Sequence, residues 1–589
     1  MTAKAYSNEK NVQVVLALLK AHNIRKVVAS PGATNITVVA SMQQDPWFEM
    51  YSSVDERSAA YIACGLAAES GEPVVLSCTG ATASRNYEPG LTEAYYRKLP
   101  ILALTSTQNT NRIGHLIAQN VDRSVLPNDI ATVRVNVPMV RDVNDAWECE
   151  VKVNEALLAL RRNGGGPVHI NLGTSYSRDY SVEKLPEARA IYRYNEHDEL
   201  PELPSGRIAV FVGSHKKWTQ EESDALDAFC ATNNAVVFCD HTSGYKGKYR
   251  VLYALVATQL KRANEMRNID LAIHIGEISG DYFTLGLAFK NVWRVNEDGE
   301  LRDTFRKVTK IFEMPESVFF RHYSKNGANE TSLLEAYQAD CEQTRQMMPE
   351  IPFSNLWVAK QLSPVLPEHS VLHLGILNTL RSWNMFEIPK SVLSYCNVGG
   401  FGIDGSVSSL IGASLVNPKK LYFGILGDLG FFYDMNAIGN RHVGNNCRIL
   451  IINNGRGIEF RNYAHQGSVF GEKTDLYIAA AGHYGNKSPI LVKNMAEALG
   501  YEYITASTKE DFEKVYKRFV TPALTDKPMI FEVFTNTEDE SKALEIVRNY
   551  MQGVPVATCL KPNEEKDTKE EKDTKQGLLQ KLLPGLKKK

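Results

Sequence analysis

The chain has 589 residues, which is enough for three or four domains at the usual domain size of about 100 to 200 residues. Lys and Arg total 66 and Asp and Glu total 68, so the formal charge of −2 gives no reason to expect binding to nucleic acid or to an anionic membrane. With 43% hydrophobic and 23% charged residues, the composition is that of an ordinary globular protein and excludes the disordered and fibrous classes.

The nine cysteines occur singly along the chain, without a CxxC pair, which disfavours a zinc site or a disulfide framework. The N-terminal residues lack the apolar core of a secretory signal. No stretch approaches the roughly 18 continuous apolar residues that a membrane span needs. We therefore expect a cytoplasmic protein without a membrane span.

The first part of the chain alternates between helical and strand patterns. Apolar residues at helical spacing follow Ser7, and a β-rich run at 26–29 comes next. Two more predicted strands, at 74–77 and 101–105, each follow a helical pattern, at 59–68 and 91–96. This alternation predicts a parallel sheet covered by helices.

Two later parts repeat this alternation. A Pro-, Glu- and Arg-rich stretch at 185–205 is predicted to be a linker, and a second boundary falls near 347–353. Predicted strands lie at 208–212, 236–239, 271–275, 371–374, 421–426, 448–452 and 529–534. The predicted fold is α/β, with three tandem doubly wound parallel-sheet domains at 1–185, 186–345 and 346–556. Residues 557–589, in which EEKDTK occurs twice in succession, are predicted to be a charged, solvated tail.

Two polar motifs follow neighbouring strands of the third unit. Gly427-Asp428-Leu429 follows one predicted strand, and Asn453-Asn454 ends the next, with Asn454 26 positions after Asp428. Glycine lets the backbone approach a phosphate, and carboxylate and amide oxygens are suitable ligands for Mg²⁺. Either motif alone is more typical of an ordinary turn, so only the pair indicates a site.

The first unit carries a second candidate cluster. Glu56 begins a helix of small apolar residues, and Thr79, Gly80 and Thr82 lie in a loop between a predicted strand and a helix. A glutamate at a helix start also interacts favourably with the helix dipole, and for Glu56 alone that structural role is the more common one.

Together these residues resemble the thiamine-diphosphate (ThDP) enzymes and, within them, MenD (SEPHCHC synthase) of menaquinone biosynthesis. The similar stretches cover most of the chain: SPG at Ser30, DERSAAYIACGLA at Asp55, CTGATA at Cys78, GILNTLR at Gly375, GIDG at Gly402 and GDLGFFYDMNA at Gly427. The resemblance implies the domain order aminopyrimidine-binding (Pyr), central, and diphosphate-binding (PP).

The resemblance also implies roles for single residues. Glu56 matches the catalytic glutamate that hydrogen-bonds N1′ of the aminopyrimidine, and Thr79, Gly80 and Thr82 match pyrimidine contacts. Ile403 matches the residue beneath the bent cofactor, and Gly427, Asp428 and Leu429 match the diphosphate and Mg²⁺ motif. Asn454 with the Arg456 carbonyl matches the remaining Mg²⁺ ligands, and Asn453 with the Gly455 carbonyl stays an open alternative.

The chain departs from this pattern where the family's substrate arginines are expected. Thr34, Gln108 and Val398 stand at positions where MenD-like enzymes carry basic residues, and Arg381 remains. Arginine binds carboxylates through a bidentate fork, so losing about three of them argues against the menaquinone reaction itself. We expect a 2-oxo acid donor with one carboxylate anchored near Arg381, and a neutral acceptor or none.

The expected function is ThDP- and Mg²⁺-dependent decarboxylation of a 2-oxo acid, with transfer of the acyl-anion equivalent to an acceptor. The alternative is a simple decarboxylase of the phosphonopyruvate or sulfopyruvate type. A remote alternative is a non-catalytic scaffold with the same fold. Another is a dinucleotide-binding oxidoreductase, because residues 400–405 satisfy the GxGxxG pattern of dinucleotide-binding loops. In the ThDP enzymes that the chain resembles, each active site is shared between two chains, and the resemblance therefore implies a homodimer or tetramer.

Overall fold

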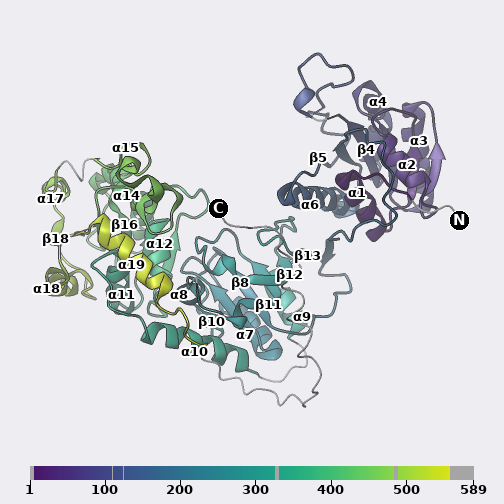
Figure 1. The fold of residues 1–589 in the computed structure, drawn as a ribbon. Coiled ribbons are helices and arrows are strands. Elements are labelled where there is room, and N and C mark those ends of the chain that lie inside the picture. The colour runs from purple at the N-terminus through teal and green to yellow at the C-terminus, as the bar shows by residue number, and fades with distance from the viewer. Residues whose placement is uncertain are drawn as a thin grey trace, which may run out of the picture.

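The computed structural model describes residues 5–108, 110–123, 125–259, 261–324, 330–482 and 488–556. These residues form three parallel sheets of six, seven and six strands, one in each of three consecutive units (Figure 1). The predicted α/β fold with three tandem parallel sheets is confirmed. The numbered domain boundaries stay predictions, and the predicted tail at 557–589 lies outside the described residues.

The first unit holds a sheet with strand order β2-β1-β3-β4-β6-β5. Chain order reverses direction between β1 and β3, which makes the sheet doubly wound. Its strands are β1 Lys26–Ala29, β2 Glu49–Ser52, β3 Val74–Thr79, β4 Ile101–Thr107, β5 Val133–Val137 and β6 Val168–Gly173. Its α-helices are α1 Lys10–Ala21, α2 Ile36–Gln43, α3 Glu56–Ser70, α4 Ala81–Asn86, α5 Glu88–Tyr96 and α6 Val143–Ala159.

The second unit holds a sheet with strand order β10-β9-β8-β11-β12-β13-β7. Its strands are β7 Tyr192–Asn195, β8 Ile208–Val212, β9 Val236–Cys239, β10 Arg250–Val251, β11 Asn268–Ile275, β12 Ala288–Val295 and β13 Val308–Glu313. Its α-helices are α7 Gln220–Asn233, α8 Ala254–Ala257, α9 Glu316–Tyr323 and α10 Ser332–Gln346.

The third unit holds a sheet with strand order β15-β14-β16-β17-β19-β18. Its strands are β14 Val371–Leu374, β15 Leu393–Cys396, β16 Tyr422–Gly427, β17 Cys447–Asn453, β18 Glu502–Ala506 and β19 Met529–Phe534. Its α-helices are α11 Asn355–Leu362, α12 Asn378–Trp383, α13 Ser406–Ser414, α14 Asp428–Tyr433, α15 Thr474–Tyr477, α17 Leu491–Ala498, α18 Lys509–Phe519 and α19 Thr537–Asn549. Two 3₁₀ segments, η7 Ile458–Arg461 and η8 Gln466–Lys473, follow β17.

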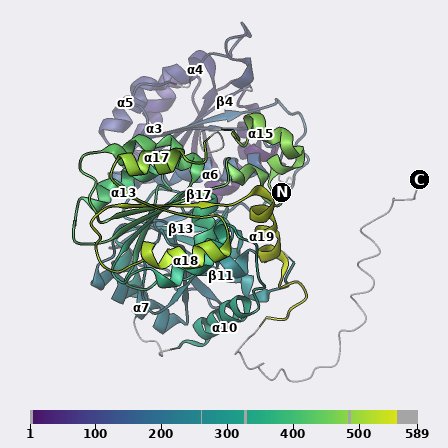
Figure 2. The same ribbon diagram turned by 90° about the vertical axis from the view of Figure 1, so that its left-hand side faces the viewer.

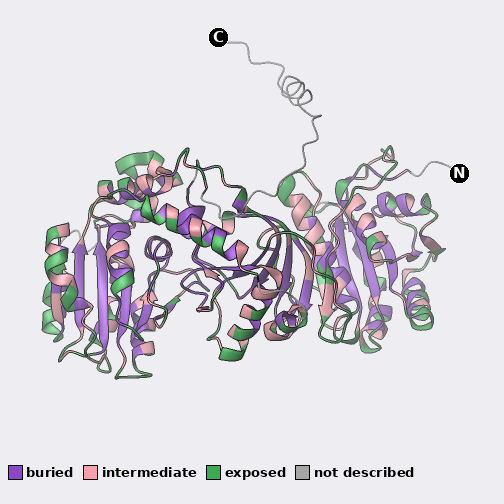
Figure 3. Cartoon of the chain, turned by 90° about the horizontal axis from the view of Figure 1, so that it is seen from below, coloured by how far each residue is buried: buried purple, intermediate pink, exposed green. Residues whose placement is uncertain are grey.

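Helices cover both faces of each sheet, so the central strands are buried on both sides and read as continuous apolar runs. In β8 and β17 every residue is buried, and Figure 3 shows the strands buried and the outer helix faces exposed. In the third unit, α11, α12, α18 and α19 pack on one face of the sheet and α13 and α17 on the other. Figure 2 shows α17 and α18 on opposite sides of these strands.

The segment predicted to be a linker contains a strand. Within 185–205, Tyr192–Asn195 forms β7, which pairs with β13 at the edge of the second sheet. The residues around β7 are rich in Pro and Glu, and β7 itself is short and mostly polar, so this segment shows no apolar run that would indicate a strand. An edge strand has a hydrogen-bonded neighbour on one side only, and it tolerates a short, polar sequence.

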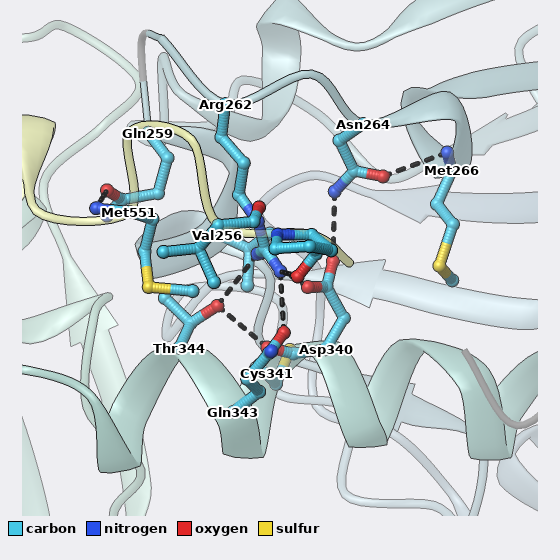
Figure 4. Close-up of polar contacts among 12 residues, drawn as sticks. Val256, Gln259, Arg262, Asn264, Met266, Asp340, Cys341, Gln343, Thr344 and Met551 are labelled. Atoms are coloured by element: carbon cyan, nitrogen blue, oxygen red, sulfur yellow. Dashed lines mark hydrogen bonds and ion pairs between the residues drawn. The ribbon is translucent and has the colours of Figure 1, made fainter. Parts of the chain in front are cut away.

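A buried polar cluster joins the second and third units (Figure 4). Arg262 donates to Asp340 Oδ1 at 2.6 Å, and both side chains are at most 1% exposed. Asp340 Oδ2 also accepts from Tyr253 and Asn264. Arg262 further donates to the Val554 and Pro555 carbonyls, and so holds the C-terminal segment of the third unit against the second unit.

Among the described residues, no helix is both long enough and apolar enough to cross a membrane. The same part of the chain contains eight cysteines as free thiols, and seven of the eight are buried.

Candidate active site

A cavity of about 90 Å³ opens at the carboxyl ends of β14, β16 and β17. It lies where chain order reverses between β14 and β16, the place at which doubly wound sheets bind ligands. The motifs chosen from the sequence meet here, because parallel strands bring their carboxyl ends to one edge. Its lining includes Gly375, Ile403, Gly427, Asp428, Leu429, Asn454 and Arg456.

The two Asn residues of the Asn453-Asn454 pair face different surroundings. Asn453 is buried, its amide donates to Glu532 at 2.7 Å, and its side-chain oxygen accepts from Gly455 N at 3.2 Å. Asn454 lines the cavity, and its buried Oδ1 has no hydrogen-bond partner among the described residues. Asp428 is buried, and its Oδ2 accepts from Gly455 N at 2.8 Å. A buried acceptor without a donor is costly, so Asn454 Oδ1 is suited to a bound cation.

Three helices, α12, α13 and α14, begin at residues that line this cavity: Asn378, Ser406 and Asp428. The N-terminus of a helix offers unpaired backbone N–H groups and a partial positive charge, which favour an anion such as a phosphate. Leu377, the residue before α12, has φ 66°, a conformation that non-glycine residues rarely adopt and that often marks functional loops.

Gly427 leaves open space at the cavity wall. Its φ is −75°, which any residue adopts, and a Cβ added there would meet no atom within 4 Å. Neither backbone conformation nor packing within the chain therefore requires glycine at this position. A ligand that approaches the backbone closely does require it.

Two buried glutamates lie behind the cavity. Glu532 accepts from Asn453 and Tyr503, and burial raises its pKa. Glu540 accepts from Asn355 N at the start of α11 and from the Thr535 hydroxyl, and burial, helped by the negative charge of Asp428, raises its pKa to about 7. Neither glutamate was identified from the sequence, because neither belongs to a motif and both resemble ordinary surface charges.

Glu540 predicts a pH dependence of stability. Its pKa of about 7 in the folded protein exceeds the ordinary value of 4.5, so the folded state binds more protons between these pH values. The free energy of unfolding therefore falls as the pH rises through this window. Glu540→Gln keeps the acceptor oxygen and removes the titration. We expect the variant to gain up to about 3 kcal/mol relative to the wild type between pH 4.5 and 7.

Urea unfolding of the cofactor-free proteins at a series of pH values measures this difference. Glu545→Gln, a half-buried position on the same helix that pairs with Lys542, is the matched control and is expected to follow the wild type. Parallel pH profiles of the wild type and Glu540→Gln would contradict the assignment.

Glu56 is the first residue of α3, and Asp55 caps the helix by accepting from Ser58 N at 3.0 Å. The Glu56 carboxylate is half-exposed and accepts from Asn86 at 3.5 Å. Within the single chain, the Glu56 carboxylate therefore stays partly open to solvent.

The other predicted contacts of the first unit lie at the same sheet edge. Thr79 is buried and its hydroxyl oxygen accepts from Thr34 N at 3.2 Å, whereas Thr82 is exposed on α4. Gly80 N donates to the Ser106 carbonyl, and a Cβ on Gly80 would lie 2.8 Å from Arg123 Nη2.

Arg123 is a buried residue that the sequence did not single out. It donates to Thr105 and Asn171, which are neutral, and burial lowers its pKa to about 10. No motif or spacing marks it, because its partners lie on strands well separated from it in the chain.

The structure places the four predicted substrate residues in different surroundings. Thr34 is buried and its hydroxyl donates to the Ser106 carbonyl at 2.6 Å. Gln108 contacts Tyr176 and accepts from Arg112. Val398 is buried against the second unit, near Gly280. Arg381 is paired with Glu459 and lies 4.5 Å from the centre of the Tyr282 ring.

Two family models match the chain. The N-terminal thiamine pyrophosphate-binding domain of thiamine pyrophosphate enzymes matches residues 10–126, and the C-terminal domain matches residues 378–533. Curated relatives align over nearly the whole chain. The 2-succinyl-5-enolpyruvyl-6-hydroxy-3-cyclohexene-1-carboxylate synthase of Bacteroides fragilis is 31% identical, covering 92% of this chain and 98% of its own. The synthase of the same name from Phocaeicola vulgatus is 30% identical, covering 93% and 99%.

Among solved structures, the thiamine diphosphate-dependent 4-hydroxybenzoylformate decarboxylase of Rhodococcus jostii RHA1 aligns at 17% identity, over 90% of this chain and 99% of that chain, with a TM-score of 0.38. A superposition of this quality supports no statement about function. The family models and the full-length relatives do: the chain belongs to the thiamine pyrophosphate enzyme family, together with the 2-succinyl-5-enolpyruvyl-6-hydroxy-3-cyclohexene-1-carboxylate synthases.

Proposed function

We propose that this protein is a ThDP- and Mg²⁺-dependent enzyme that decarboxylates a 2-oxo acid and transfers the resulting acyl-anion equivalent to an acceptor. The observation that carries the proposal is the third-unit cavity, in which Asp428 and the unpartnered Asn454 Oδ1 meet three helix starts. Bound ThDP supplies the electron sink for loss of CO₂. A cytoplasmic location is part of the proposal, supported by the free thiols.

The residues present fit the implied metal. Asp428, Asn454 and the Arg456 carbonyl would supply a carboxylate, an amide oxygen and a backbone oxygen, which are ligands that Mg²⁺ accepts. No group of three or more His, Cys, Asp or Glu side chains suited to a metal occurs in the described part of the chain. The proposed ligand set differs from such a group because it contains only one carboxylate, with an amide oxygen and a backbone oxygen. The hydrogen bonds of Asn453 favour Asn454 over Asn453 as the amide ligand.

Glu56 is proposed to hydrogen-bond the aminopyrimidine and to set its protonation, in a site shared between two chains. Hydrogen bonds link the first unit to the second and the second unit to the third. Figure 1 shows the first unit, which contains Glu56, and the third unit, which contains Asp428, at opposite ends of the molecule. Exposed apolar side chains flank both half-sites: Val54, Tyr61 and Ile62 beside Glu56, and Tyr433 on α14. These observations support a homodimer or tetramer.

The relatives are named 2-succinyl-5-enolpyruvyl-6-hydroxy-3-cyclohexene-1-carboxylate synthases, and we propose that this chain does not carry out the reaction of that name. Thr34 already uses its hydroxyl within the chain, Val398 is buried and apolar, and Gln108 is neutral. None of them offers the charge that a carboxylate needs.

Incubation of the protein with ThDP, Mg²⁺ and a panel of 2-oxo acids tests the proposal. CO₂ release that rises on addition of an acceptor, with a ligated product in the mass spectrum, is the expected result. Aldehyde release without an acceptor would identify the simple decarboxylase instead. Absence of CO₂ release from every 2-oxo acid would refute both, and an active, cofactor-loaded monomer in sedimentation would refute the shared site.

Paired variants separate the two amide candidates for the metal. Asn454→Ala is expected to weaken Mg²⁺-dependent ThDP binding at least tenfold with little change in stability, because its Oδ1 has no hydrogen-bond partner in the described part of the chain. Asn453→Ala is expected to destabilise the fold by about 1–3 kcal/mol, because buried Glu532 loses one of its two donors and keeps only Tyr503. Calorimetric titration and urea unfolding measure the two effects, and the reverse pattern would assign Asn453 as ligand.

Gly427→Ala tests the space beside the cavity. Because the backbone and the packing accept a methyl group, we expect the cofactor-free protein to keep its stability or to gain about 0.4–1 kcal/mol. ThDP affinity should fall at least tenfold. Gly412→Ala, at an exposed position of α13 with equal room for a methyl group, is the control and should bind ThDP as the wild type does.

A further inference from the structure

A second chamber lies directly beside the cofactor cavity, between the second and third units. Its volume is about 190 Å³, and it shares Asn378 and Glu459 with the cofactor cavity. A molecule whose reacting end lies in the cofactor cavity can therefore extend a tail into this chamber. The chamber wall comes from α12, from the segment after β17, from α19 and from Tyr282 and Phe283 of the second unit.

The chamber contains two arginines in different states. Arg381 is held by Glu459 and stacks on Tyr282. Arg548, near the end of α19, lies 5.6 Å from the centre of the Phe283 ring and has no carboxylate partner among the described residues. The buried Nε of each arginine lacks a hydrogen-bond partner in the same part of the chain. Burial also lowers the pKa of Arg548, as expected for a cation without a counter-ion.

The charges decide which arginine is available to a ligand. Arg381 and Arg548 contribute two positive charges and Glu459 one negative charge, so these three groups leave one positive charge. A carboxylate that approached Arg381 would compete with Glu459 for one guanidinium and would place two like charges side by side. Arg548 offers its donors without such competition.

We propose that this chamber is an anion subsite of the active site, in which Arg548 rather than Arg381 is the main anchor for a carboxylate on the substrate's tail. This deepens the proposed function and rests on it, because the tail belongs to the donor 2-oxo acid or to the acceptor. Glu459 acts as a positioning residue that holds Arg381. Asn462, whose Oδ1 also lacks a partner, provides an acceptor for a hydroxyl or N–H of the same ligand.

Binding to the ThDP- and Mg²⁺-loaded enzyme, measured by calorimetry, tests the subsite without turnover. The probes are glutarate and its neutral-tailed analogue glutaramate. The wild type should prefer glutarate by about 10- to 100-fold, as expected for a charge-assisted hydrogen bond. Arg548→Gln should abolish the preference, Arg548→Lys should restore part of it, and Glu459→Gln should increase it, because Arg381 is released.

Lys542→Gln is the matched control, since it removes one positive charge from the exposed face of the same helix. Melting temperatures of all variants show whether the fold is retained, and Arg548→Lys keeps the charge if Arg548→Gln is unstable. The proposal is overturned if the wild type shows no preference, if Arg548→Gln keeps it, or if Arg381→Gln alone abolishes it.

A turnover arm identifies which molecule carries the carboxylate. CO₂ release is compared for 2-oxoglutarate and 2-oxoglutaramate, which differ only in the charge of the tail. A 10- to 100-fold fall in kcat/KM for the charged member alone in Arg548→Gln assigns the carboxylate to the donor. Loss of the binding preference with unchanged donor kinetics assigns it to the acceptor. If neither compound is decarboxylated, the full panel of 2-oxo acids decides on the proposed function, while the binding result still decides on the subsite.

Discussion

Glu56→Gln is expected to slow C2–H exchange of bound ThDP by about 10²- to 10⁴-fold, the range contributed by a general acid–base group. Glutamine keeps the length of the side chain but is a far weaker acceptor and carries no charge. Because the Glu56 carboxylate accepts one long hydrogen bond from the described residues, that of Asn86 at 3.5 Å, its loss should leave the fold unchanged. Proton exchange followed by NMR measures the rate, and calorimetry measures ThDP affinity, which should change less than tenfold.

Glu69→Gln is the control for this variant, because Glu69 lies exposed on the same helix and carries the same charge. It should exchange like the wild type. Equal exchange rates in Glu56→Gln and the wild type would remove Glu56 from the catalytic role. A joint loss of exchange and of dimer formation would instead show that Glu56 acts in the interface.

Asp340→Ala is expected to destabilise the junction of the second and third units by about 3–5 kcal/mol, the usual cost of leaving one buried charge unpaired. Arg262 would keep its charge with its carboxylate partner removed, and Tyr253 and Asn264 would lose an acceptor. Urea unfolding monitored by tryptophan fluorescence should shift to lower urea, and the wild-type protein is the reference.

Two further variants show whether the unpaired charge is the cause. Glu342→Ala, on the same helix but in an exposed pair with Arg345, should unfold like the wild type. Arg262→Met combined with Asp340→Leu removes both charges and should recover much of the loss, because well-packed apolar residues often replace a buried ion pair without cost. A double variant as unstable as Asp340→Ala would assign the effect to hydrogen bonding and packing instead.

The strands that the sequence predicted correctly are those buried on both faces. Strands β1, β8, β9, β14 and β19 have the predicted bounds, because a short apolar run between turn residues is a strong signal. Strands β12 and β13 were missed because charged residues interrupt them, as in AFKNVWRV. Their identity is set by neighbouring strands, and that information is not local in the sequence.

In the candidate site, too, some residues were predictable from local sequence and others were not. The third-unit residues were predictable because each follows a strand, and parallel strands align their carboxyl ends at one edge. The state of Arg381 was not predictable, because its partner Glu459 lies 78 positions away and joins it only through the fold. Arg548 resembled an ordinary residue near a helix end, and only the chamber shows that it lacks a counter-ion.

The position of β7 determines where the chain can be divided. This strand precedes the rest of the second unit in sequence, yet it protects the outer edge of β13. A fragment of the second unit that begins after Asn195 would expose the backbone N–H and C=O groups of β13 to pairing with other molecules, and would be prone to aggregate. A separable second unit must therefore begin before Tyr192, within the segment whose composition suggests a linker.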